Sequence, residues 1–327
     1  MKGITVKQPG GADMLQVTTH DIPNISANEI LVKVETAAVN RTDIIQRETD
    51  LGYMTNNILG VEVAGTVEQI HEDTNTSLKV GDRIMGLVNG GAYAEYVAMP
   101  AERAITIPEE LSFIDAAAIP EVFLTAYQTL FWIGQLKENE TVLIHAGGSG
   151  VGTAAIQLAK QLVNATVITT AGSDEKLSFC KKLGADYLIN YKKEDFSEQI
   201  ASFTNNNGVD LILDFVGASY WEKNLASIAV DGRWVLIGIL GGKNVSDIDL
   251  FELMKKRVQL TGTLLTPRSD SYKRDLTKDF STDVLPLITN NKIHPVVDRV
   301  FALEDIKKAH EHMEVNINIG KIIIQVS

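Results

Sequence analysis

A run of small residues follows a predicted strand in the middle of the chain. The strand over residues 141–145 leads into the turn AGGSGVG at 146–152, and the pattern predicts a helix that starts within this turn. The first N–H groups of a helix are unpaired and partly positive, so they suit a diphosphate. Gly147 and Gly152 fit the outer places of the G-x-G-x-x-G pattern, while Ser149 takes the middle one. The turn predicts a dinucleotide site; a tight turn without a ligand is the alternative.

The residue type at the end of the next predicted strand indicates whether the site binds NADH or NADPH. An NAD site usually has Asp or Glu there, about 20 residues past the glycines, to bind the ribose hydroxyls. Ala171 takes that place, and Ser173 and Lys176 follow, with groups that can bind a 2′-phosphate. Asp174 and Glu175 complicate the prediction, because either could bind the ribose instead of favouring a helix N-terminus. We expect NADPH rather than NADH.

Residue types that hold zinc are scarce in this chain. Cys180 is the only cysteine, so neither an intrachain disulfide nor a four-cysteine zinc site is possible. The six histidines show no HExxH spacing. Cys180 lies among apolar residues of a predicted helix, which favours a buried thiol over a redox group. We expect no metal.

The composition of the chain disfavours two classes of partner, nucleic acids and membranes. Acidic residues outnumber basic ones by 42 to 30, for a net charge of −12 at pH 7, so a nucleic-acid backbone would be repelled. The first residues contain no apolar core of a signal peptide. No window approaches the ~18 apolar residues of a membrane span. These features predict a cytoplasmic protein with neither a nucleic acid nor a membrane as partner.

The elements that position these residues change in character along the chain. Short β-branched runs separated by turn signals predict a small barrel or bent sheet in the first 120 residues. Strands then alternate with amphipathic helices, which predicts a parallel sheet covered on both faces. If a doubly wound domain is inserted in this way, the last segment of the chain belongs to the first domain again. The predicted domains are 1–121, 122–264 and 265–327, in an α/β protein.

Several longer segments together resemble a known family. They are VNRTD at 39–43, ILGVE at 58–62, KVGDR at 79–83, HAGGSGVG at 145–152, NYKKED at 190–195, SYWEKN at 219–224, DGRWVL at 231–236 and NIGK at 318–321. On these segments the chain is identified as a member of the medium-chain dehydrogenase/reductase superfamily, in its zinc-free, zeta-crystallin-like quinone oxidoreductase branch. The resemblance implies a GroES-like β-rich catalytic domain, an inserted Rossmann domain, and NADPH in the cleft between them.

The resemblance also assigns residues to the cofactor. It implies that Asn40 and Thr125 lie near the nicotinamide, and that Ser149, Gly150 and Val151 hold the diphosphate. The residues implied around the 2′-phosphate are Gly172, Ser173, Lys176 and Tyr191. Those implied on the other side of the nicotinamide are Ile239, Leu240, Leu264 and Lys321.

The family resemblance also indicates whether the chain binds zinc and which residue contacts the substrate. Zinc alcohol dehydrogenases of the superfamily carry an early cysteine and a Gly-His-Glu segment, whereas this chain has Gly60-Val61-Glu62 and no early cysteine. The resemblance places Tyr53 in the substrate pocket, where a phenol can stack on a quinone and donate to its carbonyl; a core or loop aromatic is the alternative. Asn40 and Tyr53 are the catalytic candidates.

We therefore expect a zinc-independent NADPH:quinone oxidoreductase, whose family implies release of semiquinones. An electron-poor quinone needs little acid assistance, whereas a plain ketone needs stronger polarisation. An NADPH-dependent reductase of enone or alkenal double bonds is one alternative, and an NADPH-binding sensor module without turnover is another. Family resemblance also implies a homodimer joined through Rossmann edge strands.

Overall fold

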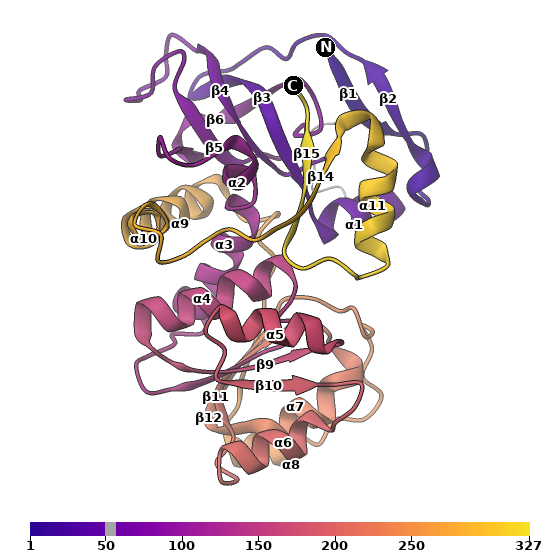
Figure 1. Cartoon of the computed structure of the whole chain (residues 1–327), viewed down its shortest axis with the longest axis vertical. Helices are drawn as coiled ribbons and strands as arrows, with labels where there is room; N and C mark the ends of the chain where they lie inside the picture. Colours follow the sequence, from indigo (N-terminus) through magenta and orange to yellow (C-terminus); the bar gives the residue numbers. More distant parts are fainter. Residues whose placement is uncertain (50–56) are drawn as a thin grey trace. The chain divides into compact units, whose positions relative to one another are not determined.

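The chain forms two compact units. The computed structural model describes residues 1–49 and 57–327. Unit 1 holds Met1–Leu124 together with Leu265–Ser327, and unit 2 holds the intervening Thr125–Leu264. Figure 1 shows both ends of the colour range within unit 1 and the middle of the range in unit 2. Unit 2 is thus inserted into unit 1.

A six-stranded sheet in which all neighbours pair in parallel forms the centre of unit 2. Its order is β10-β9-β8-β11-β12-β13, so the direction of winding reverses between β8 and β11. Ligands of such sheets bind beyond the carboxyl ends of the strands at this reversal. The strands are β8 (Thr141–Ile144), β9 (Thr166–Ala171), β10 (Tyr187–Asn190), β11 (Val209–Asp214), β12 (Ile228–Leu236) and β13 (Gln259–Gly262).

Helices cover both faces of this sheet. Figure 1 shows α4 and α5 on one side of the strands and α6, α7 and α8 on the other. Fully buried Leu143, Ile168 and Ile212 of the strands pack with Phe196 and Leu225 of α6 and α7. The helices are α4 (Gly150–Val163), α5 (Asp174–Lys182), α6 (Phe196–Phe203), α7 (Trp221–Ser227) and α8 (Leu250–Lys256), and a π-helical segment covers Gln128–Ile133. The parallel sheet predicted from the sequence is confirmed.

One predicted helix of unit 2 ends early. The sequence pattern predicts a helix over 219–230, but a 3₁₀ turn covers Ala218–Tyr220, α7 ends at Ser227 and β12 starts at Ile228. Ile228 is buried in the sheet core, and its β-branched side chain favours the extended backbone that it adopts there.

Unit 1 is organised around a seven-stranded sheet of order β14-β15-β3-β4-β5-β7, in which β6 also pairs with β3. A separate antiparallel ribbon joins β1 and β2. The strands are β1 (Lys2–Val6), β2 (Leu15–Thr19), β3 (Glu29–Val39), β4 (Glu62–Ile70), β5 (Arg83–Leu87), β6 (Tyr96–Pro100), β7 (Ala104–Thr106), β14 (Val297–Ala302) and β15 (Lys321–Gln325).

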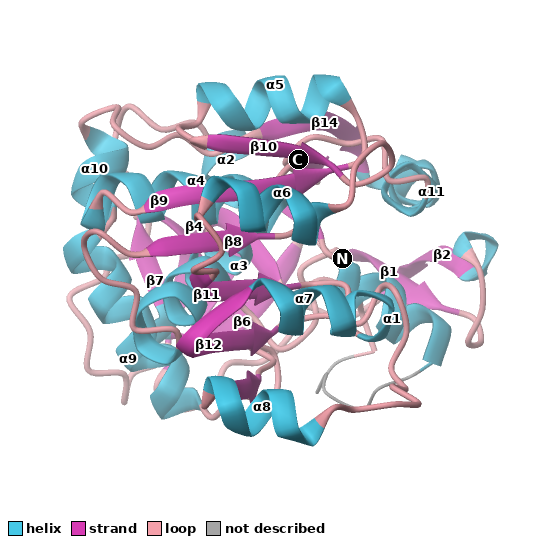
Figure 2. Cartoon of the chain, turned by 90° about the horizontal axis from the view of Figure 1, so that it is seen from below, coloured by secondary structure: helices cyan, strands magenta, loops and turns pink. Residues whose placement is uncertain are grey.

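Two segments far apart in the chain meet in this sheet. Strand β15 pairs with β3 in antiparallel register, with Ile322 opposite Val39, and with β14 in parallel. The helices of unit 1 are α1 (Arg41–Thr49), α2 (Phe113–Ala117), α9 (Asp270–Asp283), α10 (Leu285–Thr289) and α11 (Ile306–Glu314), while α3 (Pro120–Tyr127) runs from unit 1 into unit 2. The sequence pattern did not predict α9, α10 or β14. Figure 2 shows the elements in a second view.

None of the helices that the structure describes combines the length and apolar character needed to cross a bilayer.

Candidate active site

The glycine-rich turn of unit 2 joins the carboxyl end of β8 to the first turn of α4. The Ser149 side chain caps α4, because its Oγ accepts a hydrogen bond of 3.0 Å from the Gly152 N–H. The Gly147 N–H donates to the Thr170 carbonyl at 2.9 Å, which fixes the turn against β9. A Cβ at Gly147 would lie 2.1 Å from Thr169 Oγ1, so this approach requires glycine. The arrangement leaves a helix N-terminus at the carboxyl edge of the sheet, where an anion can bind.

Basic and phenolic side chains gather beside this turn. A Cβ at Gly148 would lie 3.0 Å from Lys176 Cδ, so the lysine stem passes over the glycine. A Cβ at Gly172 would lie 2.7 Å from the Tyr191 hydroxyl and 3.2 Å from Lys192 Cε. The structure thus places Lys176 beside Gly148, and Tyr191 beside Gly172. It adds Lys192, which the sequence analysis missed although two lysines directly follow Tyr191.

The acids at the start of α5 are arranged differently from a ribose-binding carboxylate. Ser173 caps the helix by accepting from the Lys176 N–H at 3.3 Å. Asp174 accepts from Asn190 Nδ2 at 2.7 Å and from Lys193 Nζ at 2.6 Å. These bonds, from Lys193 first and Asn190 second, hold the pKa of Asp174 below its usual value. Asp174 is thus committed to protein partners, while Glu175 is exposed.

A buried polar network lies at the carboxyl ends of the strands beneath the turn. His145 Nδ1 lies 2.9 Å from Thr170 Oγ1, and its Nε2 lies 2.8 Å from Asn224 Oδ1. The Asn224 amide donates in turn to Asp214 Oδ2 at 3.0 Å. Since Asn224 Oδ1 can only accept, His145 must donate from Nε2 and accept at Nδ1, and burial lowers its pKa. A neutral histidine therefore links β8, β9, β11 and α7 at the edge where the turn begins.

The predicted nicotinamide side of unit 2 is apolar. Ile239, Leu240 and Leu264 are each more than half exposed, and Ile239 borders a hollow of about 140 Å³. Exposed apolar side chains in a group are unusual unless something covers them. Thr125 is buried, and its carbonyl accepts a hydrogen bond of 2.7 Å from Thr129 Oγ1.

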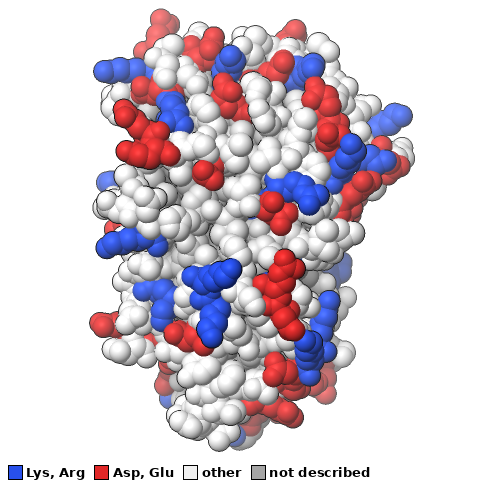
Figure 3. All heavy atoms as spheres, in the orientation of Figure 1, with Lys and Arg blue, Asp and Glu red and all other residues white. Residues whose placement is uncertain are grey.

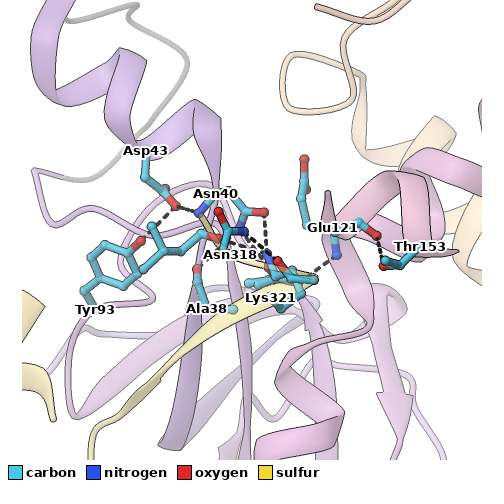
Figure 4. A network of polar contacts seen from close by, with 12 residues as sticks. Ala38, Asn40, Asp43, Tyr93, Glu121, Thr153, Asn318 and Lys321 are labelled. Carbon is cyan, nitrogen blue, oxygen red and sulfur yellow. Dashed lines mark hydrogen bonds and ion pairs between the residues drawn. The ribbon is translucent and has the colours of Figure 1, made fainter. Parts of the chain in front are cut away.

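In unit 1 a buried ion pair joins the first residues of β4 and β15. Lys321 Nζ lies 2.7 Å from Glu62 Oε1, and it also donates to Asn40 Oδ1 at 2.6 Å and to the Val39 carbonyl at 3.0 Å. Asn40 Nδ2 donates to Glu62 Oε1 at 2.7 Å. Figure 4 shows Asn40 and Lys321 together at the centre of this group. Lys321 thus makes two hydrogen bonds and one ion pair with protein groups, and both ends of the Asn40 amide are bonded, so the two side chains hold each other in place.

The same group does not fit a zinc ion. Val61, which stands where the zinc enzymes have histidine, is buried and has no metal-binding atom. Glu62 is neutralised by Lys321. Within residues 1–49 and 57–327, no three His, Cys, Asp or Glu side chains gather as metal ligands.

A buried carboxyl lies on the other side of Asn40. Asp43 Oδ2 accepts from the Asn40 N–H and from the Tyr93 hydroxyl, each at 2.8 Å. Its Oδ1 is buried and bonds to no group in the described part of the chain. Burial raises the pKa of Asp43 to about 7, because the charged form loses its water.

Two candidate residues, Tyr53 and Cys180, remain to be placed. Tyr53 lies outside the described residues, so the structure gives no position for its phenol. Cys180 is fully buried, and burial raises the pKa of its thiol to about 12, which makes it unreactive.

Comparisons with known proteins agree with this geometry. The family model "Alcohol dehydrogenase GroES-like domain" matches residues 26–109, and "Zinc-binding dehydrogenase" matches 150–282. The synaptic vesicle membrane protein VAT-1 of Tetronarce californica is 31% identical, over 95% of this chain and 84% of its own length. The structure of Escherichia coli quinone oxidoreductase complexed with NADPH is 28% identical in sequence. The match has a TM-score of 0.91 and covers 100% of both chains. CurK enoyl reductase is 26% identical with a TM-score of 0.87, over 100% of this chain and 99% of its own.

Both domains, the inserted parallel sheet and the replaced zinc ligand point to one family. The chain belongs to the medium-chain dehydrogenase/reductase superfamily of oxidoreductases, in its zinc-free quinone oxidoreductase branch.

Proposed function

We propose that the chain is an NADPH-dependent reductase whose substrates are quinones. The observation that carries the proposal is the set of groups beside the glycine-rich turn. Lys176, Tyr191 and Lys192 gather there, while Ala171 replaces the usual ribose-binding acid and Asp174 is paired with Lys193. The quinone class is supported by the similarity to Escherichia coli quinone oxidoreductase, whose structure contains NADPH.

The residues fit NADPH in the following way. The N-terminus of α4, with Ser149, Gly150 and Val151, would hold the diphosphate. Around the 2′-phosphate would stand Gly172, Ser173, Lys176 and Tyr191, with Lys192 in addition. On the nicotinamide side would stand Thr125, Ile239, Leu240 and Leu264 of unit 2, with Asn40 and Lys321 of unit 1. NADPH, when bound, supplies a hydride.

Reduction of a quinone suits a site without zinc. A quinone is electron-poor, so hydride addition needs little polarisation of its carbonyl. Val61 and the Glu62–Lys321 pair favour zinc independence. We expect prolonged chelation to leave turnover unchanged and elemental analysis to find no stoichiometric zinc. A bound zinc whose removal stops turnover would contradict this expectation.

Tyr53 is the proposed substrate contact. Its phenol would orient the quinone by a hydrogen bond, so Tyr53→Phe should lower kcat/KM by a few-fold to about a hundredfold. NADPH affinity should be almost unchanged, as measured by fluorescence titration. Equal kinetics for variant and parent would return Tyr53 to a structural role.

The main test is an NADPH-oxidation screen over ortho-quinones, para-quinones, enones and alkenals. Preferred turnover of quinones supports the proposal. Turnover confined to conjugated double bonds would favour the second candidate, an enone or alkenal reductase, which the similarity to CurK enoyl reductase supports. Tight NADPH binding without consumption of any acceptor would indicate a sensor module.

We also propose a cytoplasmic homodimer. Strand β13 lies at an edge of the sheet with all its residues exposed, and α8 beside β12 exposes Leu250, Phe251 and Met254 by 65–73%. A second copy could pair with this edge and cover these side chains. Sedimentation at twice the chain mass would support it, and a monomer at micromolar concentration would contradict it. Fractionation of cells tests the location.

Nucleic acid is not part of the proposal. Acidic and basic side chains are interspersed over the face in Figure 3, which shows no continuous basic stripe. With a net charge of −12, long-range attraction to phosphate backbones is not expected.

A further inference from the structure

The segment SYWEKN at 219–224 contains a tyrosine that the proposed function does not use. Tyr220 is the last residue of the 3₁₀ turn Ala218–Tyr220 and directly precedes α7. Asp214, the last residue of β11, accepts a hydrogen bond of 3.0 Å from the Gly217 N–H. The Tyr220 N–H donates in turn to the Gly217 carbonyl at 2.9 Å. The backbone that carries Tyr220 is therefore fixed at the carboxyl edge of the parallel sheet.

Three aromatic rings contact the ring of Tyr220. The centroids of the His145 and Phe196 rings lie 4.9 and 4.8 Å from its own. Both of these residues are buried, and His145 is fixed further by its bond to Asn224. The third ring is that of Tyr191, with a centroid 6.2 Å away and a plane at 70° to the Tyr220 ring, which is an edge-to-face contact. Tyr220 thus connects a buried, fixed cluster with Tyr191.

Tyr191 is itself held less firmly than this cluster. It directly follows β10 and is 43% exposed. Within the described part of the chain, Tyr220 is the only aromatic ring in contact with it. Its hydroxyl nevertheless lies at Gly172, where a Cβ would be 2.7 Å from the oxygen. Without a neighbouring ring, a half-exposed phenol would be free to rotate into solvent, and a ligand that bound it would have to order it first.

We propose that Tyr220 is a positioning residue for the 2′-phosphate of NADPH, and that it acts through Tyr191 rather than by touching the phosphate. The proposal rests on the proposed function and deepens its cofactor part. Contact with the Tyr220 ring keeps the Tyr191 hydroxyl at Gly172, beside Lys192, before a cofactor binds. A donor that is already in place loses less conformational entropy on binding, so it adds more to the affinity. Since NADH has no 2′-phosphate, Tyr220 favours NADPH over NADH.

The variant that tests this role is Tyr220→Leu, which keeps an apolar side chain but removes the ring. Fluorescence titration should show NADPH binding weakened by about three- to tenfold, because part of the Tyr191 hydrogen bond is lost, and NADH binding changed by less than about twofold. Tyr220→Phe keeps the ring contact and should restore most of the NADPH affinity. The matched control is Tyr187→Leu at the start of β10, since the Tyr187 ring stacks on Phe203 instead. It should leave both affinities unchanged.

A double variant separates positioning from packing. Tyr191→Phe removes the hydroxyl itself and should weaken NADPH binding about tenfold. If Tyr220 acts through this hydroxyl, adding Tyr220→Leu to Tyr191→Phe should cause little further loss, because the two effects are then not additive. Losses that multiply in the double variant would overturn the proposal. So would a loss in Tyr220→Leu that is equal for NADPH and NADH.

Two fragments of the cofactor complete the test without a quinone. Adenosine 2′,5′-bisphosphate carries the phosphate that Tyr191 would bind, and 5′-AMP lacks it. Calorimetry should show that Tyr220→Leu weakens binding of the bisphosphate alone. An unchanged affinity for the bisphosphate, in a variant whose circular dichroism shows that it is folded, would refute the role of Tyr220.

The same measurements distinguish this role from the proposed function. An unmodified protein that binds the two fragments equally has no 2′-phosphate site, which would overturn the role of Tyr220 and the choice of NADPH together. A protein that shows the expected losses in Tyr220→Leu but reduces no quinone would contradict the quinone function and still support the role of Tyr220.

Discussion

Lys176 and Lys192 give the candidate cofactor site its most direct test. Each would make a charge-assisted hydrogen bond to the 2′-phosphate, so Lys176→Ala or Lys192→Ala should weaken NADPH binding by roughly ten- to a hundredfold. NADH lacks the phosphate, and its binding should be almost unchanged. Fluorescence titration at low salt is the measurement, because partly exposed charges are screened.

The matched control is Lys182→Ala, at the exposed end of α5. Ala171→Asp should move the preference further toward NADH, because a carboxylate there repels the phosphate and accepts from the free ribose hydroxyls. Equal losses for both cofactors in the Lys176 and Lys192 variants would contradict the assignment. Asp174 or Glu175 would then become the candidate ribose ligand.

Single residues of the site were predictable where their partners are close in sequence. The Ser149 turn and Ala171 follow from local patterns next to predicted strands. The His145–Asn224 bond spans 79 residues and the Lys321–Asn40 bond spans 281, so no local pattern reveals them.

The glycine-rich turn makes a prediction about a single element. A Cβ at Gly147 would lie 2.1 Å from Thr169 Oγ1 and 3.0 Å from Cys180 Sγ, two buried atoms that cannot move aside easily. Gly147→Ala should therefore lower the free energy of unfolding by about 1–3 kcal/mol. Urea unfolding followed by circular dichroism measures this change.

Gly148→Ala is the paired variant of the same turn. The three nearest atoms to its Cβ, at 3.0–3.2 Å, all belong to the flexible Lys176 side chain. Stability should change by less than about 0.5 kcal/mol, while displacement of Lys176 should weaken NADPH binding. A large loss of stability in Gly148→Ala, or none in Gly147→Ala, would show that the turn is packed differently.

Elements were predicted well where strands and helices alternate and less well elsewhere. The hydrophobic pattern predicts a strand over 209–214 and a helix over 250–256, and β11 and α8 have these bounds. Helix α9 was missed because its charged sequence buries only one narrow strip, which includes Leu276 and Phe280. Strand β14 was missed because its residues are half-buried or exposed, so it lacks the apolar alternation of an inner strand.

At the scale of the whole molecule, buried acids predict how stability depends on pH. Burial raises the pKa of Asp43 from 3.8 to about 7, so the folded chain keeps a proton that the unfolded chain releases near pH 4. The stability from this proton is complete below pH 4 and is lost as pH rises through 7. Over that window the free energy of unfolding should fall by about 1.4 kcal/mol per pH unit for each such proton.

Asp43→Asn should flatten this dependence, because its amide oxygen can still accept from Tyr93 and Asn40 but carries no titrating proton. Urea unfolding at pH 5, 6, 7 and 8 gives the comparison, with the exposed Asp21→Asn as control. The proposal for a retained proton fails if Asp43→Asn and the unmodified protein lose stability in parallel over these pH values.

The place of β15 in the sheet of unit 1 has a consequence for how the chain is synthesised. A ribosome releases β3, β4 and all of unit 2 before β15 exists, so β3 waits with an open edge. Glu62 also lacks a partner for its charge during this time, because Lys321, its only ion-pair partner in the described chain, is the first residue of β15. Unit 2 is continuous in sequence and can fold while the chain is still growing. The nascent protein thus carries one finished unit and one unfinished, aggregation-prone sheet until its last strand emerges.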